Sequence, residues 1–313
     1  MDDAISFQGA NRSYRHEALL WRAPEEFLKA TVPFVSEALG AGESVMVAVA
    51  EQRAHWLREA LGSDAEAVLF VDMAQLGRNP ARLTPAWRRF VEHAGTSQPV
   101  RGIQEPVWLG RRPEEIVEGQ LHEALLNVAV EPDTPFWLMC PYEASRLDSD
   151  VVEEVYRSHP AVVADTYRGS HLYGGRDHVD RLWSADLPPL QGEPELVPLS
   201  RAALKGVPAL VAAKAYAAGV TCDKSAELAV VVHQLVKASV HRGATEAVLR
   251  IWTSHESVIC QLSDEVVRRD PLVDRKPPLK DQRNSLYTAH ELCDLVQVRS
   301  SLSGTTVRVH TWL

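Results

Sequence analysis

The sequence lacks the features that mark several common classes of protein. It has only four cysteines, and no two of them form a Cys-x-x-Cys pair, which argues against a zinc site and against a disulfide framework. We predict that Cys140, Cys222, Cys260 and Cys293 are small core residues. No apolar run approaches the roughly 18–20 residues of a membrane span, and the acidic opening MDDAIS is unlike a signal peptide. A cytoplasmic protein with no membrane association is therefore expected.

The chain also lacks an excess of positive charge. Its 33 Lys and Arg residues against 42 Asp and Glu residues leave a formal net charge of −9, and no useful Lys/Arg cluster occurs. Proteins that bind nucleic acid directly usually present a basic face to the phosphates. Any role in transcription is therefore expected to proceed through protein contacts. With 313 residues, 45% of them hydrophobic and 24% charged, the chain is long enough for two globular domains.

Proline is concentrated in one segment, residues 176–200, which contains four of them. Proline removes a backbone donor and forbids regular helix, so we interpret this segment as a linker. It separates an N-terminal domain, residues 14–175, from a C-terminal domain, residues 201–313. Apolar side chains such as Trp183 give the segment more apolar surface than a free tether needs. We expect it to pack against a domain and to couple the two, and we expect the protein to form a homodimer.

Before the linker, short apolar runs alternate with amphipathic stretches. The runs have the continuous apolarity of strands buried on both faces. They cover Ser44–Ala50, Val68–Asp72, Val100–Ile103 and Phe136–Pro141. Three of the four stretches open on proline, which suits a first helical turn. These stretches predict helices over Pro24–Leu39, Glu51–Leu61, Pro80–His93 and Pro113–Asn127. Such alternation predicts an α/β domain whose parallel sheet is covered by helices on both faces.

The pentapeptide His-Glu-Ala-Leu-Leu occurs twice, beginning at His16 and at His122, and each copy starts like the helix of a zinc protease. Such a helix needs a second histidine four residues on, where this chain has Leu20 and Leu126. A metalloprotease is excluded on this pattern. No metal ion and no other cofactor is predicted.

A set of polar residues interrupts the apolar segments of the N-terminal half. Its members are His16, Arg101, Glu105, Trp108, His122, Glu123, Asn127, Tyr142 and His159. The order of RHEALLW, RGIQEPVW, HEALLN, CPY and HP around them resembles the MEDS sensory domain over about residues 14–173. This family is regarded as a ligand-sensing relative of RecA-like ATPases without their phosphate loop. The resemblance implies a RecA-like sheet. The nine residues form either a small-molecule pocket at the strand ends or an internal hydrogen-bond network.

After the linker, the pattern of elements changes. We expect two helices, a strand pair and a closing strand, over Asp223–His241, Leu286–Leu295, Ala247–Trp252, Val258–Leu262 and Ser303–Val309. This order resembles the GHKL ATPase domain, and within that superfamily it is most similar to the anti-sigma-factor kinases. The resemblance implies an α+β GHKL (Bergerat-like) sandwich.

The residues that carry GHKL chemistry are altered in this chain. Members of the family have a Glu and an Asn four residues apart on the first helix, where this sequence has Gln234 and Ala238. A Gln cannot take a proton at neutral pH, and an Ala offers no ligand to Mg²⁺. The lid segment, residues 281–286, has no glycine to let phosphates approach the backbone. The degenerate site comprises Gln234, Ala238, Asp264, Val266, Arg283, Ser285, Gly304 and Thr305.

The two resemblances together imply a bacterial anti-sigma-factor regulatory protein. A signal received by the N-terminal domain would alter how a catalytically inactive C-terminal domain holds a sigma factor, an anti-sigma antagonist or a similar regulator. Two alternatives remain open. One is an active protein-serine kinase of the anti-sigma-factor type, which would use ATP and Mg²⁺. The other is a small-molecule-binding protein whose C-terminal part mediates dimerisation.

Overall fold

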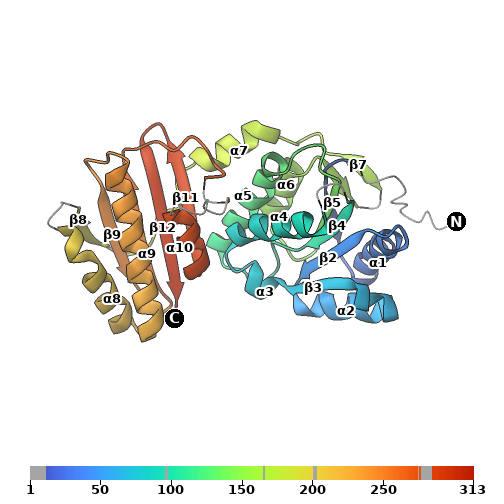
Figure 1. Cartoon of the computed structure of the whole chain (residues 1–313), viewed down its shortest axis with the longest axis horizontal. Coiled ribbons are helices and arrows are strands. Elements are labelled where there is room, and N and C mark those ends of the chain that lie inside the picture. Colours follow the sequence, from blue (N-terminus) through green and yellow to red (C-terminus); the bar gives the residue numbers. More distant parts are fainter. Residues whose placement is uncertain (1–11, 96–97, 165, 200–202, 274, 276–283) are drawn as a thin grey trace. The chain divides into compact units, whose positions relative to one another are not determined.

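The computed structural model describes residues 12–95, 98–164, 166–199, 203–273, 275 and 284–313. The chain divides into two compact units, Met1–Val179 and Asp180–Leu313 (Figure 1).

The N-terminal unit is built around one sheet. Its strands are β1 (Arg15–Trp21), β2 (Ser44–Val49), β3 (Val68–Asp72), β4 (Val100–Gln104), β5 (Phe136–Glu143), β6 (Ala161–Val163) and β7 (Tyr167–Gly169). The strand order is β3-β2-β4-β5-β1-β6-β7, and every pairing is parallel except that of β7 with β6. The central strands are buried on both faces, as their continuous apolarity requires.

Helices cover both faces of this sheet (Figure 1). Short helical pieces join some of the elements: η1 (Gly62–Ala67), α3 (Met73–Leu76) and η2 (Pro80–Arg82). One face packs against α1 (Pro24–Gly40) and α2 (Glu51–Leu61), and the other against α4 (Leu83–Ala94), α5 (Pro113–Ala129) and α6 (Ser149–Ser158). Alternation along each strand divides the core: Val45 and Val47 of β2 face α1 and α2, whereas Met46 faces the other layer.

The predicted fold class is confirmed, with a mostly parallel sheet flanked by helices and a separate antiparallel sheet in the C-terminal region. The bounds of β3 and α2 agree with the prediction, and the helix expected over Pro80–His93 begins as η2 before it continues as α4. We did not predict β1, which lies between β5 and β6.

The C-terminal unit contains an antiparallel sheet. Its strands are β8 (Glu195–Pro198), β9 (Val248–Thr253), β10 (Ser257–Asp264), β11 (Leu295–Ser301) and β12 (Gly304–Trp312), in the order β11-β12-β10-β9-β8. Its helical elements are η3 (Ala203–Lys205), α8 (Val207–Ala218), α9 (Cys222–His241) and α10 (Ser285–Leu292). Helix α9 packs against both α8 and α10, and all three contact the sheet.

Two expectations need correction here. The segment expected to be an irregular linker begins with a helix, α7 (Gly175–Ser184), and later supplies β8. The prolines start only after α7, whose Val179 and Trp183 are four residues apart and buried. The helix expected over Leu286–Leu295 ends at Leu292, because the chain becomes extended at Cys293 and enters β11.

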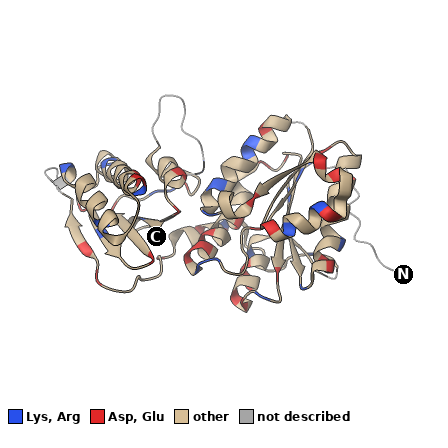
Figure 2. Cartoon of the chain, turned by 90° about the horizontal axis from the view of Figure 1, so that it is seen from below, with Lys and Arg blue, Asp and Glu red and all other residues tan. Residues whose placement is uncertain are grey.

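Charged residues are distributed over both units. Figure 2 shows Lys and Arg interspersed with Asp and Glu along the helices. Within the described part of the chain, no helix combines the length and apolarity needed to cross a membrane.

Candidate functional site

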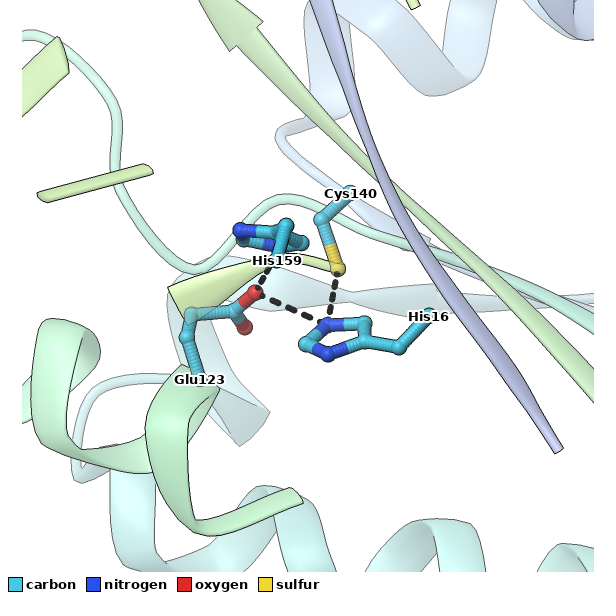
Figure 3. Close-up of side chains that lie close together, drawn as sticks. All are labelled: His16, Glu123, Cys140 and His159. Carbon is cyan, nitrogen blue, oxygen red and sulfur yellow. Dashed lines mark hydrogen bonds and ion pairs between the residues drawn. The ribbon is translucent and has the colours of Figure 1, made fainter. Parts of the chain in front are cut away.

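Four side chains from different elements of the N-terminal unit meet beneath α5 (Figure 3). They are His16 of β1, Glu123 of α5, Cys140 of β5 and His159, which follows α6. One ligand atom of each lies within 4.8 Å of the others. We call these four residues the His-Glu-Cys-His cluster. Strand pairing explains half of it, because Ala18 of β1 lies opposite Cys140, which places His16 and Cys140 on the same face.

The contacts within the cluster are short. His16 Nε2 lies 3.2 Å from Glu123 Oε2 and 3.3 Å from Cys140 Sγ. His159 Nε2 lies 2.7 Å from the same carboxylate oxygen. All four residues are at most 2% exposed, so water does not screen these interactions.

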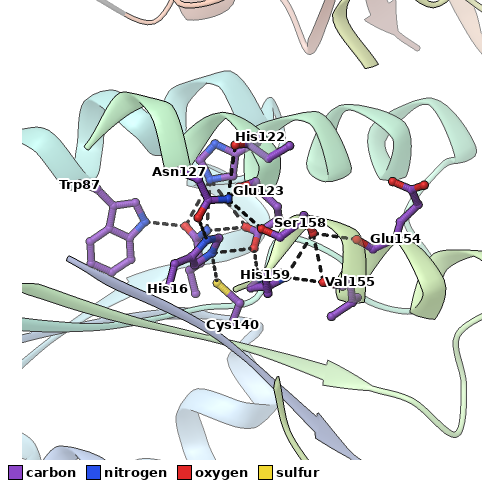
Figure 4. Close-up of polar contacts among 12 residues, drawn as sticks. His16, Trp87, His122, Glu123, Asn127, Cys140, Glu154, Val155, Ser158 and His159 are labelled. Carbon is purple, nitrogen blue, oxygen red and sulfur yellow. Dashed lines mark hydrogen bonds and ion pairs between the residues drawn. The ribbon is translucent and has the colours of Figure 1, made fainter. Parts of the chain in front are cut away.

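A shell of hydrogen bonds orients the two histidines (Figure 4). Asn127 Nδ2 donates to the carbonyl oxygen of Ser158 at 2.7 Å, which leaves the Asn127 Oδ1 oxygen facing His16 Nδ1 at 3.1 Å. His159 Nδ1 lies 2.8 Å from the carbonyl oxygen of Val155. Because these oxygens only accept, each histidine carries its proton on Nδ1, and each turns Nε2 toward the cluster.

A second chain of contacts orients the carboxylate. The Trp87 indole N–H donates to Gln104 Oε1 at 2.5 Å, so the Gln104 amide nitrogen is free to donate to Glu123 Oε1 at 2.6 Å. The same amide lies 3.2 Å from His122 Nε2, and His122 Nδ1 lies 3.2 Å from Thr84 Oγ1. His122 therefore belongs to this chain of contacts rather than to the cluster.

Burial and mutual contacts shift the pKa values of the cluster. Burial raises the pKa of Glu123, but the close polar contacts and charge interactions with His159 and His16 outweigh it and hold the pKa well below its usual range. Burial, and then the His16 charge, lower the pKa of His159. Burial and the Glu123 carboxylate raise the pKa of Cys140 well above its usual value. Tyr142 stands edge-on to His159, with ring centroids 5.6 Å apart, and burial followed by the Glu123 charge raises its pKa.

The structure does not bring all nine predicted residues together. His16, Glu123 and His159 form the cluster with Cys140, and His122, Asn127 and Tyr142 surround it. Arg101, Glu105 and Trp108 lie elsewhere.

Arg101 is on the opposite face of the sheet. It lies opposite Val45 and Trp137, which both face α1 and α2, because one residue along a strand reverses the side-chain direction. Glu105 contacts Arg53 of α2 at 3.1 Å and accepts from the backbone N–H of Ala50.

Trp108 is in the loop before α5. The guanidinium of Arg111 lies over its ring at 4.3 Å. No contact joins Trp108 to the cluster within the described residues.

Glu105 predicts a pH dependence of stability. Burial raises its pKa to about 7, although Arg53 and the Ala50 N–H oppose the shift. Its stabilising contribution is fully present below the unfolded value near 4.5 and is lost as the pH rises through 7. Between pH 5 and pH 8 the wild-type protein should lose up to about 3 kcal/mol through this group. Urea unfolding of Glu105→Gln should show a flatter profile, whereas Glu51→Gln, an exposed control on α2, should follow the wild type. An equally steep profile in Glu105→Gln would contradict the assignment.

A cavity of about 240 Å³ opens beside the hydrogen-bonded shell. Its lining is mostly apolar and includes Trp87, Val91, Leu126 and Phe136. Thr84 and Trp87 line the cavity and also contact His122 and Gln104, so the cavity is linked to the cluster through hydrogen bonds.

The C-terminal unit places the predicted nucleotide-site residues at several positions. Asp264, Gly304 and Thr305 line one cavity of about 230 Å³ at the ends of β10 and β12. The carbonyl oxygen of Val266 accepts from the Thr305 hydroxyl.

The other predicted nucleotide-site residues lie on or near two helices. Gln234 and Ala238 are half-buried on α9, and Ser285 is the first residue of α10. Arg283 lies outside the described residues.

Asp264 is buried at the end of β10. It is 7% exposed, and its Oδ2 oxygen accepts from the Ser239 hydroxyl and contacts the Arg242 guanidinium at 3.2 Å. Its Oδ1 oxygen accepts from the backbone N–H of Val266 at 3.1 Å. Both carboxylate oxygens are therefore engaged within the protein.

The sequence interpretation did not assign Cys140 to the site. We predicted that all four cysteines are core residues; Cys140, Cys260 and Cys293 are buried, but Cys222, the first residue of α9, is exposed, so the prediction is wrong there. The Cys140 sulfur faces His16 rather than only apolar groups. The available signal was the Cys-Pro-Tyr run, which places Cys140 and Tyr142 on the same face of a strand.

Comparisons with known proteins bear on the N-terminal unit. Residues 15–160 match the family model described as MEDS, the MEthanogen/methylotroph, DcmR Sensory domain. This segment is a MEDS domain. Among solved structures, the chain is similar to the RsbU and RsbW domains of Rv1364c from Mycobacterium tuberculosis, at 16% identity and a TM-score of 0.30. That match covers 38% of this chain and 32% of the other, so this chain spans about a third of its length. No curated protein matches the sequence.

Proposed function

We propose that this chain is a regulatory protein that receives a signal in its MEDS domain and acts on a protein partner through a GHKL-like C-terminal domain without catalysis. The MEDS match supports the sensory role. The partner is a sigma factor, an anti-sigma antagonist or a similar regulator. This part of the proposal rests on the resemblance of the C-terminal sequence to anti-sigma-factor kinases.

The main observation in favour of a catalytically inactive domain is that both carboxylate oxygens of Asp264 are hydrogen-bonded within the protein. In the GHKL pattern this residue accepts a hydrogen bond from the adenine amino group. Here Ser239, Arg242 and the Val266 N–H occupy its oxygens. These contacts use three of the roughly four acceptor positions of the carboxylate, so an adenine amino group would have to share the Oδ1 oxygen with the Val266 N–H inside a buried site.

Two further positions support the same conclusion. Gln234 stands where the family has its catalytic carboxylate, and its amide cannot accept a proton at neutral pH. Ala238 stands at the magnesium position and has no ligand atom.

Titration of the full chain with ATP tests this proposal. We expect no saturable heat in calorimetry, either with or without Mg²⁺. The variant Gln234→Glu/Ala238→Asn restores the family's carboxylate and amide, and it should also fail to bind ATP, because Asp264 remains engaged. Saturable binding by the wild-type chain that depends on Mg²⁺ would favour the alternative, an active protein-serine kinase.

A second candidate function is favoured by the cavity in the N-terminal unit. Its apolar lining and its contact with Thr84 suit a small, mostly apolar ligand with one polar group. A ligand there would contact Thr84 and Trp87, whose side chains hydrogen-bond to His122 and Gln104. The second candidate function is therefore the sensing of a small molecule by the N-terminal unit, and it does not depend on which partner the C-terminal domain binds.

A further inference from the structure

The His-Glu-Cys-His cluster presents an excess of electron-pair donors to one point. Asn127 and Val155 take the Nδ1 protons of His16 and His159, so in the neutral imidazoles both Nε2 atoms face the cluster with lone pairs. Glu123 Oε1 is held by Gln104, which leaves Oε2 facing the same centre. Two imidazole nitrogens and a carboxylate oxygen, all of them hydrogen-bond acceptors, therefore lie close together, and the Cys140 thiol is the only hydrogen-bond donor that the cluster offers them.

The direction of one contact reinforces this imbalance. His159 Nε2 and Glu123 Oε2 are only 2.7 Å apart. Nevertheless, among the described residues this nitrogen has no hydrogen-bond partner of acceptable direction. The two atoms are therefore close without the alignment of a hydrogen bond. Buried polar atoms are normally satisfied, so a cation among these ligand atoms is the simplest way to satisfy them all.

We propose that His16, Glu123, Cys140 and His159 bind one divalent transition-metal ion of the zinc class. The nitrogen and sulfur ligands exclude Mg²⁺ and Ca²⁺, which prefer sets of oxygen ligands. When the Cys140 Sγ–metal bond forms, the thiol releases its proton to solvent and no electron is transferred. Two neutral imidazoles, one carboxylate and one thiolate then balance a 2+ charge, so the buried centre is neutral overall.

The distances suit a tetrahedral ion. Zinc bonds of about 2.0–2.3 Å imply ligand–ligand edges of about 3.3–3.6 Å. The edges from His16 to Glu123 and to Cys140 measure 3.2 and 3.3 Å. Of these three edges, the His159–Glu123 pair, at 2.7 Å, has to open by about 0.6 Å. The remaining ligand atoms lie within 4.8 Å of one another, so any pair beyond about 3.6 Å has to close.

The proposed site is closed, because four protein ligands fill a tetrahedral ion and leave no open position for a substrate. The ion would tie β1, β5, α5 and the residue after α6 together across 143 residues of sequence, from His16 to His159. Its role is therefore structural or signal-receiving rather than catalytic. A metal ion at these four residues differs from the sequence-based expectation that the protein binds no metal.

Cobalt binding to the full chain tests the site, because a tetrahedral Co²⁺–thiolate bond gives a charge-transfer absorption band. After treatment with a chelator, the wild-type protein should bind about one Co²⁺ with this band, and Zn²⁺ should displace it. Cys140→Ala should lose the band. The matched control is Cys260→Ala, which removes a buried cysteine of β10 in the other unit and should keep both the band and the stoichiometry.

The outer shell provides a second, milder variant. Asn127→Ala leaves all four ligands but frees the His16 ring, and it should weaken Co²⁺ binding about 10–100-fold. Near-UV circular dichroism checks the fold of each variant, and Asn127→Ala carries the test if Cys140→Ala does not fold. A folded wild-type chain that binds no Co²⁺ would overturn the proposal, as would a Co²⁺ band that persists in Cys140→Ala. In that case a protonated, positively charged histidine compensates the negative charge of Glu123. Neither result depends on ATP or on a partner, so this test is separate from that of the proposed function.

Discussion

Replacing Arg101 by Ala should lower the free energy of unfolding by about 3–5 kcal/mol. The Arg101 side chain is 3% exposed, and its Nε donates to Glu43 at 2.9 Å while its Nη1 donates to the carbonyl oxygen of Phe34 at 3.0 Å. Its guanidinium also lies over the rings of Phe34 and Trp137. Truncation leaves the Glu43 carboxylate buried without its close cation and opens a cavity beside the two rings. Urea unfolding at pH 7 measures the loss.

Two further variants give this prediction its controls. Arg89→Ala removes an exposed arginine from α4 and should change stability by no more than about 0.5 kcal/mol. Arg101→Met/Glu43→Leu removes both charges and should recover most of the loss, because the expense lies in the unpaired carboxylate. If Arg101→Ala is as stable as Arg89→Ala, Arg101 is not a structural residue and its place in a ligand pocket would have to be reconsidered.

The strands that the sequence predicts well are those with continuous apolarity. Strand β1 escaped prediction because its first three residues are Arg15, His16 and Glu17, which interrupt any apolar run. The fold accommodates them one by one. Arg15 lies over the Trp137 ring at 3.4 Å and pairs with Glu17, while His16 contacts Glu123, Cys140 and Asn127. Apart from Glu17, these partners are distant in sequence, so local pattern alone could not reveal them.

The residues of the candidate site could also be predicted only in part from the sequence. The order of motifs identified His16, Glu123 and His159, yet it also grouped Arg101 with them, because motif order does not say which face of a strand a side chain occupies. Cys140 was overlooked for the opposite reason. A buried cysteine in an apolar strand has the same local pattern whether it packs or binds, and only the register with β1 brings its sulfur to His16. A metal site assembled from four separate elements has no short spacing to recognise.

In the C-terminal unit, Gly304→Ala should have the largest effect of any small substitution. Gly304 has φ +128°, a conformation that side chains with a Cβ rarely adopt. A Cβ at this position would lie 2.0 Å from the carbonyl oxygen of Asp264 and 2.9 Å from the Cα of Glu265. Both neighbours are backbone atoms, so relief requires β10 and β12 to separate where they pair. We expect a loss of about 4 kcal/mol or more, in the range of severe backbone and packing defects.

Hydrogen exchange measured by mass spectrometry locates the effect of this substitution. In Gly304→Ala, the amides of β10 and β12 should lose protection, whereas those of β1 and β5 in the other unit should keep it. The matched control is Gly243→Ala, since Gly243 also has a positive φ, of +96°, but a Cβ there meets nothing within 4 Å. It should lose only about 1–2 kcal/mol, from backbone conformation alone. Equal losses in the two variants would show that the close approach of Gly304 to Asp264 does not matter, and that β12 tolerates a side chain at its first residue.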